Sequence, residues 1–275
     1  MSSNKMSRKD FLSLSAVAGV STLVGSSALM TSCGEKAPEY TPLKQLEGAY
    51  IPVLNDKADD GKELKAGVIG CGGRGSGAIV DLLNAANGIK VVALGDTFAD
   101  RLQNLKKNLA EKHNQVVADD KCFVGFDAYK KVIDSGVDMV VIATPPVFRP
   151  VHFQYATEKG VHSFLEKPIA VDPKGYRMIM ATAKQAKAKN LSVVCGTQRH
   201  HQRPYVEAFQ KIQEGMIGEI TGGNVYWNQS QLWFKPRKKE WCDTEWMVRD
   251  WVNWKWLSGD HIVEQHVHNI DVFLW

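Results

Sequence analysis

A glycine-rich turn between a short apolar strand and a helix constrains this 275-residue chain more than any other feature. The turn is Gly70-Cys71-Gly72-Gly73-Arg74-Gly75, a Gly-x-Gly-x-x-Gly pattern. In such turns the first glycine permits a tight bend, the second lets the backbone approach a pyrophosphate, and the third lets the helix pack closely on the strand. The helix N-terminus then offers unpaired N–H groups to phosphate oxygens. The pattern predicts a dinucleotide-binding site, with these residues contacting the cofactor.

Strand and helix signals alternate along the chain around this turn. Apolar runs predict strands at 65–69, 89–94, 137–143, 161–165 and 191–195, and helical periodicity predicts helices at 74–86, 98–112 and 174–189. Strands that alternate with helices of this length form a parallel sheet through right-handed crossovers. The fold class is therefore α/β, with a doubly wound parallel sheet in a dinucleotide-binding Rossmann domain over residues 63–196.

The second predicted strand ends at Asp96, about 20 residues after Gly75. A carboxylate at this position accepts hydrogen bonds from ribose hydroxyls and repels a 2′-phosphate. Arg101 follows closely and partly offsets that repulsion. We expect NAD as the cofactor in preference to NADP, with Asp96 and Arg101 at the ribose.

Residues 1–33 have the features of a targeting segment, with basic residues followed by an uncharged, weakly apolar stretch. Residues 7–12, Ser-Arg-Lys-Asp-Phe-Leu, resemble a twin-arginine export signal with lysine as the second basic residue. Residues 29–33 resemble a lipoprotein cleavage box that ends at Cys33. We expect export to the periplasm or cell envelope and a lipid anchor on Cys33 as the only membrane attachment; the alternative is a plain signal peptide. Residues 34–62 are polar and aperiodic, which indicates a linker.

Composition excludes two classes of partner. The net charge of +4 is small and dispersed along the chain, so nucleic acid is not expected. The cysteines do not have metal-finger spacing, and the His and Glu residues near the C-terminus match no standard zinc motif, so no metal is expected.

Four landmarks occur in order: the glycine turn, Thr144-Pro145, Glu166-Lys167-Pro168, and Glu264-Gln-His-Val-His268-Asn-Ile-Asp271. Together they resemble the Gfo/Idh/MocA oxidoreductase family over about residues 64–275. The resemblance implies a Rossmann domain followed by an open-faced antiparallel sheet domain, acting on sugars, cyclitols and related polyols with NAD or NADP. It places Thr144, Pro145 and Glu166 at the cofactor, and Lys167, Glu264 and His268 at the reaction centre.

These three residue types suit the oxidation of an alcohol. Imidazole titrates near neutral pH, so His268 is the candidate base. Glu264 lies four residues earlier and would share a helix face with His268, where it binds substrate or tunes the imidazole. Lys167 supplies a positive charge that stabilises a developing alkoxide. Pro168 restricts the Lys167 backbone to an extended conformation.

In residues 197–275 the regular alternation of strand and helix signals ends, and this part contains all eight tryptophans. We expect them to form an incomplete substrate domain with one clear strand over 219–226, because the family's sheet normally continues further. We therefore expect a C-terminally truncated chain that reaches full activity only if another chain completes the sheet. Pairing through this sheet is common in the family, so the resemblance also implies a homo-oligomer. The candidate substrate contacts are Arg199, His261, His266, Trp227 and Trp233; the alternatives are a solvated turn for Arg199 and core packing for the tryptophans.

The leading functional hypothesis is a dehydrogenase that passes a hydride between a sugar, glycoside or cyclitol hydroxyl and the nicotinamide. A second hypothesis is a glycosidase that oxidises its substrate transiently, eliminates, adds water and reduces, so that bound NAD is recycled. A third is a lipoprotein that binds a dinucleotide or sugar without catalysis. Accumulation of NADH distinguishes the first hypothesis from the second.

Overall fold

The computed structural model describes Ile51, Ala58 and residues 61–275. The predicted leader with Cys33, and most of the predicted linker, lie outside these residues. Within the described part, none of the helices has the length and apolar character needed to cross a membrane. By their contacts, Lys211–Glu219 belong to one compact unit, and Glu47–Gln210 together with Ile220–Trp275 belong to another. In that shorter part Lys211 pairs with Glu214 at 2.5 Å.

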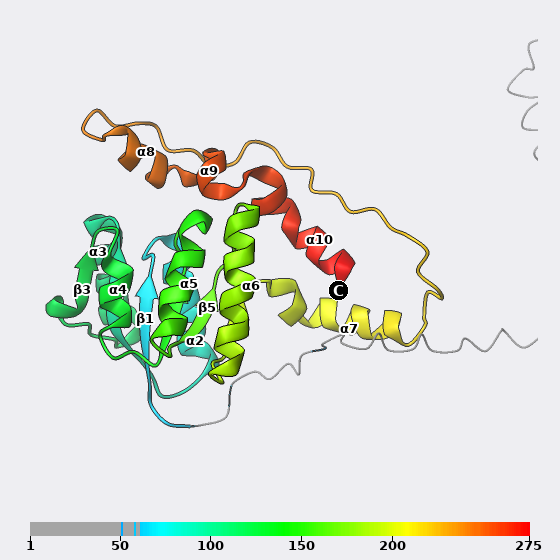
Figure 1. Ribbon diagram of the computed structural model, residues 1–275, viewed down its shortest axis with the longest axis horizontal. Coiled ribbons are helices and arrows are strands. Elements are labelled where there is room, and N and C mark those ends of the chain that lie inside the picture. The colour runs from blue at the N-terminus through cyan, green and yellow to red at the C-terminus, as the bar shows by residue number, and fades with distance from the viewer. Residues whose placement is uncertain (1–50, 52–57, 59–60) are drawn as a thin grey trace, which may run out of the picture. The chain divides into compact units, whose positions relative to one another are not determined.

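Six parallel strands form one sheet in the order β3-β2-β1-β4-β5-β6 (Figure 1). The bounds are β1 Leu64–Ile69, β2 Ile89–Asp96, β3 Cys122–Val124, β4 Met139–Ile142, β5 His162–Leu165 and β6 Val193–Cys195. All five predicted strands of the Rossmann domain are present. The three-residue edge strand β3 was not predicted, because its residues are partly exposed and too few to form an apolar run.

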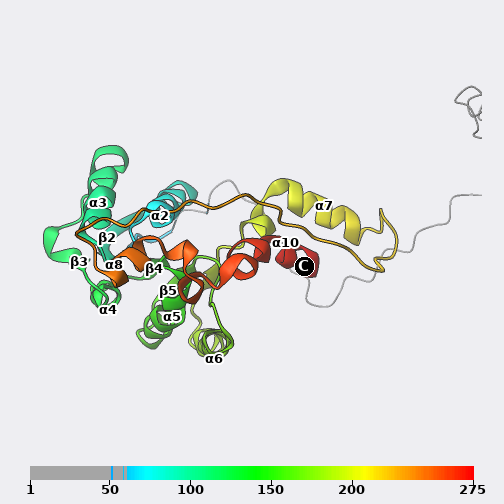
Figure 2. The ribbon, with the colours of Figure 1, turned by 90° about the horizontal axis from the view of Figure 1, so that it is seen from above.

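Helices cover both faces of the sheet. Figure 2 shows α2 (Gly73–Ala85) and α3 (Ala99–His113) on one side, with α4 (Ala128–Ile133), α5 (Arg149–Glu158) and α6 (Pro173–Ala188) on the other. Two apolar cores follow, one under each set of helices. The short 3₁₀ turns Asp119–Lys121 and Pro146–Phe148 connect these elements. The predicted α/β, doubly wound class is confirmed.

The strand order changes direction between β1 and β4, which lie side by side although β2 and β3 come between them in sequence. In an open parallel sheet, the carboxyl ends of strands at such a switch point frame the ligand crevice. The glycine turn follows β1 at this edge, and Thr144-Pro145 follows β4. The topology therefore brings two predicted site elements together.

The strand predicted over 219–226 is wrong. These residues carry no strand pairing, and every strand pair in the described chain is parallel. Alternating residues favour an extended backbone, but a strand also needs a hydrogen-bonding neighbour, and the described residues supply none here. Residues 197–275 instead form η4 (Gln198–His201), α7 (Arg203–Gln213), α8 (Asp243–Arg249), η5 (Trp251–Asn253), α9 (Lys255–Ser258), η6 (Ile262–His266) and α10 (Val267–Leu274). The boundary at residue 196 stays a prediction.

Helices α8 and α9 lie beyond the strand ends toward which the β1 arrow points (Figure 1). Val248 and Leu257 pack with Phe98, which follows β2, in a third apolar cluster. The Arg249 guanidinium donates to both carboxylate oxygens of Asp100 in the first turn of α3, at 3.1 and 2.9 Å. This part of the C-terminal region is therefore fastened to the carboxyl edge of the sheet.

Candidate active site

The glycine turn has the close approaches that its sequence predicts. Gly70 has a φ of +93°, a conformation that L side chains rarely adopt. A Cβ on Gly75 would lie 1.8 Å from the carbonyl oxygen of Gly70, so only glycine fits there. A Cβ on Gly73 would meet no atom within 4 Å, and one on Gly72 would meet only the Arg101 side chain, at 3.8 Å. The turn is thus tight against its own strand and open toward the cleft, which fits a pyrophosphate.

Asp96 ties this turn to the end of β2. Its carboxylate accepts hydrogen bonds from the backbone N–H of Cys71 at 2.6 Å and of Phe98 at 2.8 Å. Burial raises the pKa of Asp96, while these two hydrogen bonds and the charge of Arg101 oppose the rise. Asp96 therefore has a structural role in the turn in addition to the ribose contact predicted from its position.

One cleft of about 750 Å³ runs along this edge of the sheet. It brings together all the residues predicted to contact the cofactor, and also Glu264 and Trp233. Trp233 was predicted to contact substrate, and it lines the same cleft as Lys167 and Glu264 and the predicted cofactor residues. The predicted residues that line the cleft are Gly70, Gly72, Gly73, Arg74, Gly75, Asp96, Arg101, Thr144, Pro145, Glu166, Lys167, Trp233 and Glu264.

Arg149, in the first turn of α5, holds the backbone on both sides of Lys167. Its guanidinium donates to the carbonyl oxygens of Thr144 at 2.9 Å, Glu166 at 2.8 Å and Pro168 at 2.6 Å. The side chain is buried, and burial lowers its pKa to about 10, although the charges of Glu264 and Glu166 oppose this. No motif in the sequence indicates this residue.

Glu166 joins the glycine turn to the strand end that carries Lys167. Its Oε1 lies 2.5 Å from Arg74 Nε, and its Oε2 accepts the backbone N–H of Lys167 at 3.1 Å. Glu166 is buried, whereas the Arg74 side chain is half exposed. The ion pair therefore positions Arg74 at the mouth of the cleft and leaves part of its guanidinium accessible to a ligand.

Lys167 and Glu264 meet at the inner end of the cleft. Lys167 Nζ donates to Glu264 Oε1 at 2.9 Å and also to the Glu264 carbonyl oxygen. Glu264 Oε2 is buried and has no hydrogen-bond partner in the described chain. Burial raises the pKa of Glu264, and the Lys167 charge opposes the rise. One carboxylate oxygen is thus engaged by Lys167, and the other has no partner in the described chain.

His268 lies next to this pair on α10. Burial lowers its pKa to about 4, and the charges of Lys167 and Arg199 add to the effect, so the imidazole is neutral near pH 7. The wide π-helical turn of η6 separates Glu264 from His268, so the predicted single α-helical face is wrong in detail. Glu264 nevertheless contacts Lys167 directly, and His268 lines a second cavity of about 900 Å³ on the sheet face together with Lys167.

The remaining substrate candidates surround His268. The Trp227 ring lies 5.6 Å from the His268 ring, centroid to centroid, and the Arg199 guanidinium lies 5.6 Å from the Trp227 ring centroid. Arg199 also donates a hydrogen bond to Asn269 Oδ1. His266 Nε2 is buried without a hydrogen-bond partner in the described chain.

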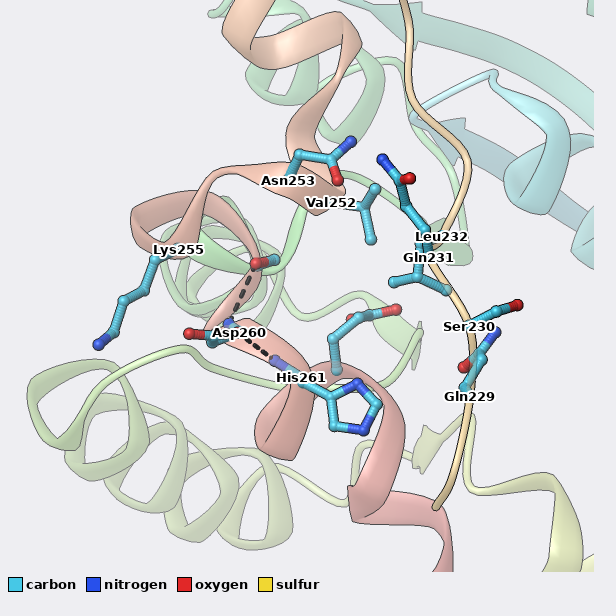
Figure 3. A pocket seen from close by; sticks show the side chains of 11 residues that line it. Gln229, Ser230, Gln231, Leu232, Val252, Asn253, Lys255, Asp260 and His261 are labelled. Atoms are coloured by element: carbon cyan, nitrogen blue, oxygen red, sulfur yellow. Dashed lines mark hydrogen bonds between the residues drawn. The ribbon is translucent and has the colours of Figure 1, made fainter.

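His261 belongs to a third, smaller cavity of about 320 Å³, shown in Figure 3. Gln229, Ser230 and Gln231 come from an extended segment on one side, and Asn253 lies on the other. Glu264 lines this cavity as well as the cofactor cleft. In the part of the chain that the structure describes, no group of three or more His, Cys, Asp or Glu side chains is arranged to hold a metal ion.

Comparisons with known proteins agree with this geometry. Residues 64–212 match the family described as oxidoreductases with an NAD-binding Rossmann fold, Gfo/Idh/MocA. A protein of Solibacter usitatus named glycosyl hydrolase family 109 protein is 27% identical over 258 residues, covering 90% of this chain and 52% of the relative. The NAD(+)-dependent scyllo-inositol 2-dehydrogenase of Bacillus subtilis is 27% identical over 160 residues, covering 57% of this chain and 42% of the relative.

Solved structures show the same fold. Apo scyllo-inositol dehydrogenase of Lactobacillus casei has a TM-score of 0.55 at 21% identity, covering 79% of this chain and 56% of that one. An NAD-binding protein of Listeria innocua has a TM-score of 0.54 at 22% identity, covering 77% and 54%. The chain spans about half the length of the curated relatives it matches. With its NAD-binding Rossmann fold and a family match over more than half of its length, this chain belongs to the Gfo/Idh/MocA oxidoreductase family.

Proposed function

We propose that this protein oxidises a secondary hydroxyl of a sugar, glycoside or cyclitol with NAD as hydride acceptor. The observation that carries the proposal is the pair formed by Lys167 and Glu264 at the inner end of the cofactor cleft, with Glu264 Oε2 buried and unpartnered. A buried polar atom without a partner is costly, and a ligand hydroxyl would satisfy it. A polyol offers such hydroxyls.

Bound NAD would supply a nicotinamide ring that accepts the hydride from the substrate carbon. The Lys167 ammonium stabilises negative charge on the substrate oxygen as the hydroxyl loses its proton. Arg149 keeps Lys167 aimed by holding the carbonyl groups on either side of it. Because these donors are fixed before substrate arrives, little reorganisation is needed during the reaction.

His268 is neutral near pH 7, so its imidazole can take the hydroxyl proton. Glu264 Oε2 accepts a hydrogen bond from a substrate hydroxyl and thereby orients the ring. The charge of Lys167 serves twice, since it stabilises the oxygen and also favours the neutral form of His268. The inositol dehydrogenase relative supports a cyclitol or sugar as the substrate class.

A second candidate is a glycosidase that oxidises, eliminates, hydrates and reduces its substrate, with no net change in NAD. The observation in its favour is coverage: the glycosyl hydrolase family 109 relative aligns over 90% of this chain, against 57% for the inositol dehydrogenase. In this reaction Lys167 and His268 keep the same roles, because the first step is again removal of a hydride and a proton.

The discriminating experiment uses the full chain purified without added cofactor. The protein is denatured, and NAD(H) and NADP(H) released into the supernatant are measured by mass spectrometry. The native protein is then incubated with NAD and a panel of cyclitols, sugars and nitrophenyl glycosides. NADH accumulation with a polyol supports the dehydrogenase, and release of nitrophenol without NADH supports the glycosidase.

A third outcome would contradict both enzymatic proposals. If NAD binds with no turnover of any panel member, and Lys167→Ala leaves binding of NAD and sugars unchanged, the protein is a binding module. A protein that neither retains nor binds NAD would contradict all three functions. Lys174→Ala is the matched control, because Lys174 is exposed on α6 and lines none of the three cavities that contain the site residues.

We also propose that the protein is exported and lipidated at Cys33, on the strength of residues 7–12 and 29–33. Mass spectrometry of the N-terminal peptide from a membrane fraction would detect the acyl chains. A Cys33→Ala variant that stays in the same fraction as the unchanged protein would contradict the anchor.

A further inference from the structure

The ribose end of the cofactor cleft is not built by the Rossmann domain alone. On one side lie Asp96 and Arg101, which follow β2. On the other side lie Trp233, Lys235 and Trp251, which come from the C-terminal region more than 100 residues later in the sequence. We call residues 233–251 the roof segment.

Hydrogen bonds fix the irregular backbone of the roof segment in this place. Asp250 is buried, and its Oδ1 accepts the backbone N–H of Lys235 at 2.6 Å and Asn253 Nδ2 at 3.0 Å. Asn253 Nδ2 also donates to the Trp233 carbonyl at 3.1 Å, and Trp246 Nε1 donates to the Lys235 carbonyl at 2.9 Å. Side chains thereby hold residues 233–235, which belong to no helix or strand of the described chain.

The roof segment is also fastened to the start of α3, beside the ribose position. Arg249 donates to both oxygens of Asp100, and Arg101 Nη2 donates to the Arg249 carbonyl at 3.3 Å. The Arg249 guanidinium lies 3.8 Å from the centroid of the Phe98 ring. A bidentate ion pair and a cation–π contact together fix orientation as well as distance.

Two features of the roof segment point to a ligand that combines an aromatic ring with phosphate. Trp233 is 47% exposed although it lines the cleft, and its ring meets Trp251 edge-on, which leaves a ring face available for stacking. The Lys235 ammonium has no hydrogen-bond or ion-pair partner within the described residues, and the charges that act on it are the cations of Arg101 and Arg249 and the carboxylates of Asp100 and Asp250. An aromatic face beside unpaired positive charge suits an adenine nucleotide.

We propose that the roof segment binds the adenosine half of NAD, with Trp233 against the adenine and Lys235 beside the ribose phosphates, and that it slows cofactor release. The Rossmann turn then holds the pyrophosphate and the roof segment closes over the far end. An enzyme that retains its cofactor between turnovers gains from such a closure, because release requires the roof segment to move away from α3.

The test measures binding of NADH and of ADP-ribose, which lacks the nicotinamide ring, to the full chain. We expect each of the variants Trp233→Ala and Lys235→Ala to lower the affinity for NADH and for ADP-ribose by equal factors. For Trp233→Ala the factor should be about tenfold, since stacking on an aromatic side chain has that order of effect. Stopped-flow displacement should assign most of the loss to a faster dissociation rate. Trp256→Ala is the matched control, because Trp256 is 49% exposed in the same region but does not line the cleft.

Asp100→Asn removes the ion pair between α3 and Arg249 without altering the roof segment itself. The Asp100 side chain is 59% exposed, so the variant should fold, and it should release NADH faster than the unchanged protein. Dissociation rates for Trp233→Ala and Lys235→Ala equal to that of Trp256→Ala would overturn the proposal. So would a loss confined to NADH with ADP-ribose unaffected, because that result assigns the roof segment to the nicotinamide half.

Discussion

The Rossmann part, residues 63–196, and the C-terminal part, residues 197–275, contribute to the same site by different means. In the first, the central strands of the sheet and the helices on its two faces form two apolar cores, and the glycine turn is positioned by contacts with residues close to it. In the second, helices are short, and Trp233 and Trp256 remain about half exposed.

The comparison shows that the proposed reaction centre is completed only where the two parts meet. Lys167 ends a Rossmann strand, and its partner Glu264 comes from the wide π-helical turn of the C-terminal part. Arg249 and Asp100 join the parts a second time, at the other end of the cleft. The Rossmann part supplies a rigid frame, and the C-terminal part supplies the groups that a substrate would meet.

The largest effect should come from the residue that links the two parts. Lys167→Met removes the positive charge that stabilises the substrate oxygen, and we expect the turnover rate to fall about 10²- to 10³-fold. Steady-state kinetics of the oxidised substrate would measure this, with binding of NAD by the same protein as the test of folding. A rate within a few-fold of that of Lys174→Met would contradict a catalytic role for Lys167.

The second largest effect should be a difference in stability between variants of the two parts. Phe153 on α5 is 1% exposed in the core, and Phe153→Ala should lower the free energy of unfolding by about 3–5 kcal/mol through lost burial and a cavity. Trp256→Ala removes a larger side chain that is half exposed, and we expect a change within about 0.5 kcal/mol. Chemical denaturation of both variants measures the difference. Equal losses would show that the C-terminal part is as tightly packed as the Rossmann core.

The sequence predicted the Rossmann part closely because its signals are local. Apolar runs located five of the six strands, and the glycine pattern located the predicted cofactor cleft. The edge strand β3 was missed, since its three residues are partly or fully exposed and carry no periodicity. Arg149 was also missed, because its partners are carbonyl oxygens brought together only by the folded β4 and β5 ends.

The C-terminal part was harder to predict because its structure depends on distant contacts. Residues 219–226 have strand-like alternation but no neighbour to pair with in the described chain. Trp233 was predicted to contact substrate, and its position in the cleft depends on a hydrogen bond that Asn253 donates to the Trp233 carbonyl and on one that Asp250 accepts from the Lys235 N–H. The family resemblance placed Lys167 and Glu264 at the same reaction centre, but the ion pair between them was not predicted, because no local pattern indicates it.

Substitutions of two glycines in the turn test whether close backbone packing holds the turn against β1. Gly75→Ala places a Cβ 1.8 Å from the Gly70 carbonyl oxygen, and relieving that overlap should cost about 1–3 kcal/mol of stability. Gly73→Ala meets no atom within 4 Å and should leave the free energy of unfolding nearly unchanged. Thermal unfolding of both variants without cofactor makes the comparison. A stable Gly75→Ala protein would mean that the turn is free to move away from β1.

The smallest effect should come from Arg199, whose positive charge acts on the candidate base His268 within the C-terminal part. Burial is the main reason that the pKa of His268 is lowered to about 4, and the Lys167 and Arg199 charges lower it further. Because only the neutral imidazole accepts a proton, activity should decline as the pH falls through about 4. Arg199→Gln removes one of the two charges, so the pKa should rise and the decline should begin at a higher pH, by a smaller shift than burial itself causes. NMR titration of labelled histidine together with the acid limb of the pH–rate profile measures the change, and Arg203→Gln on the exposed start of α7 is the matched control. An unchanged pKa in Arg199→Gln would mean that the Rossmann residue Lys167 and burial alone set the protonation of His268.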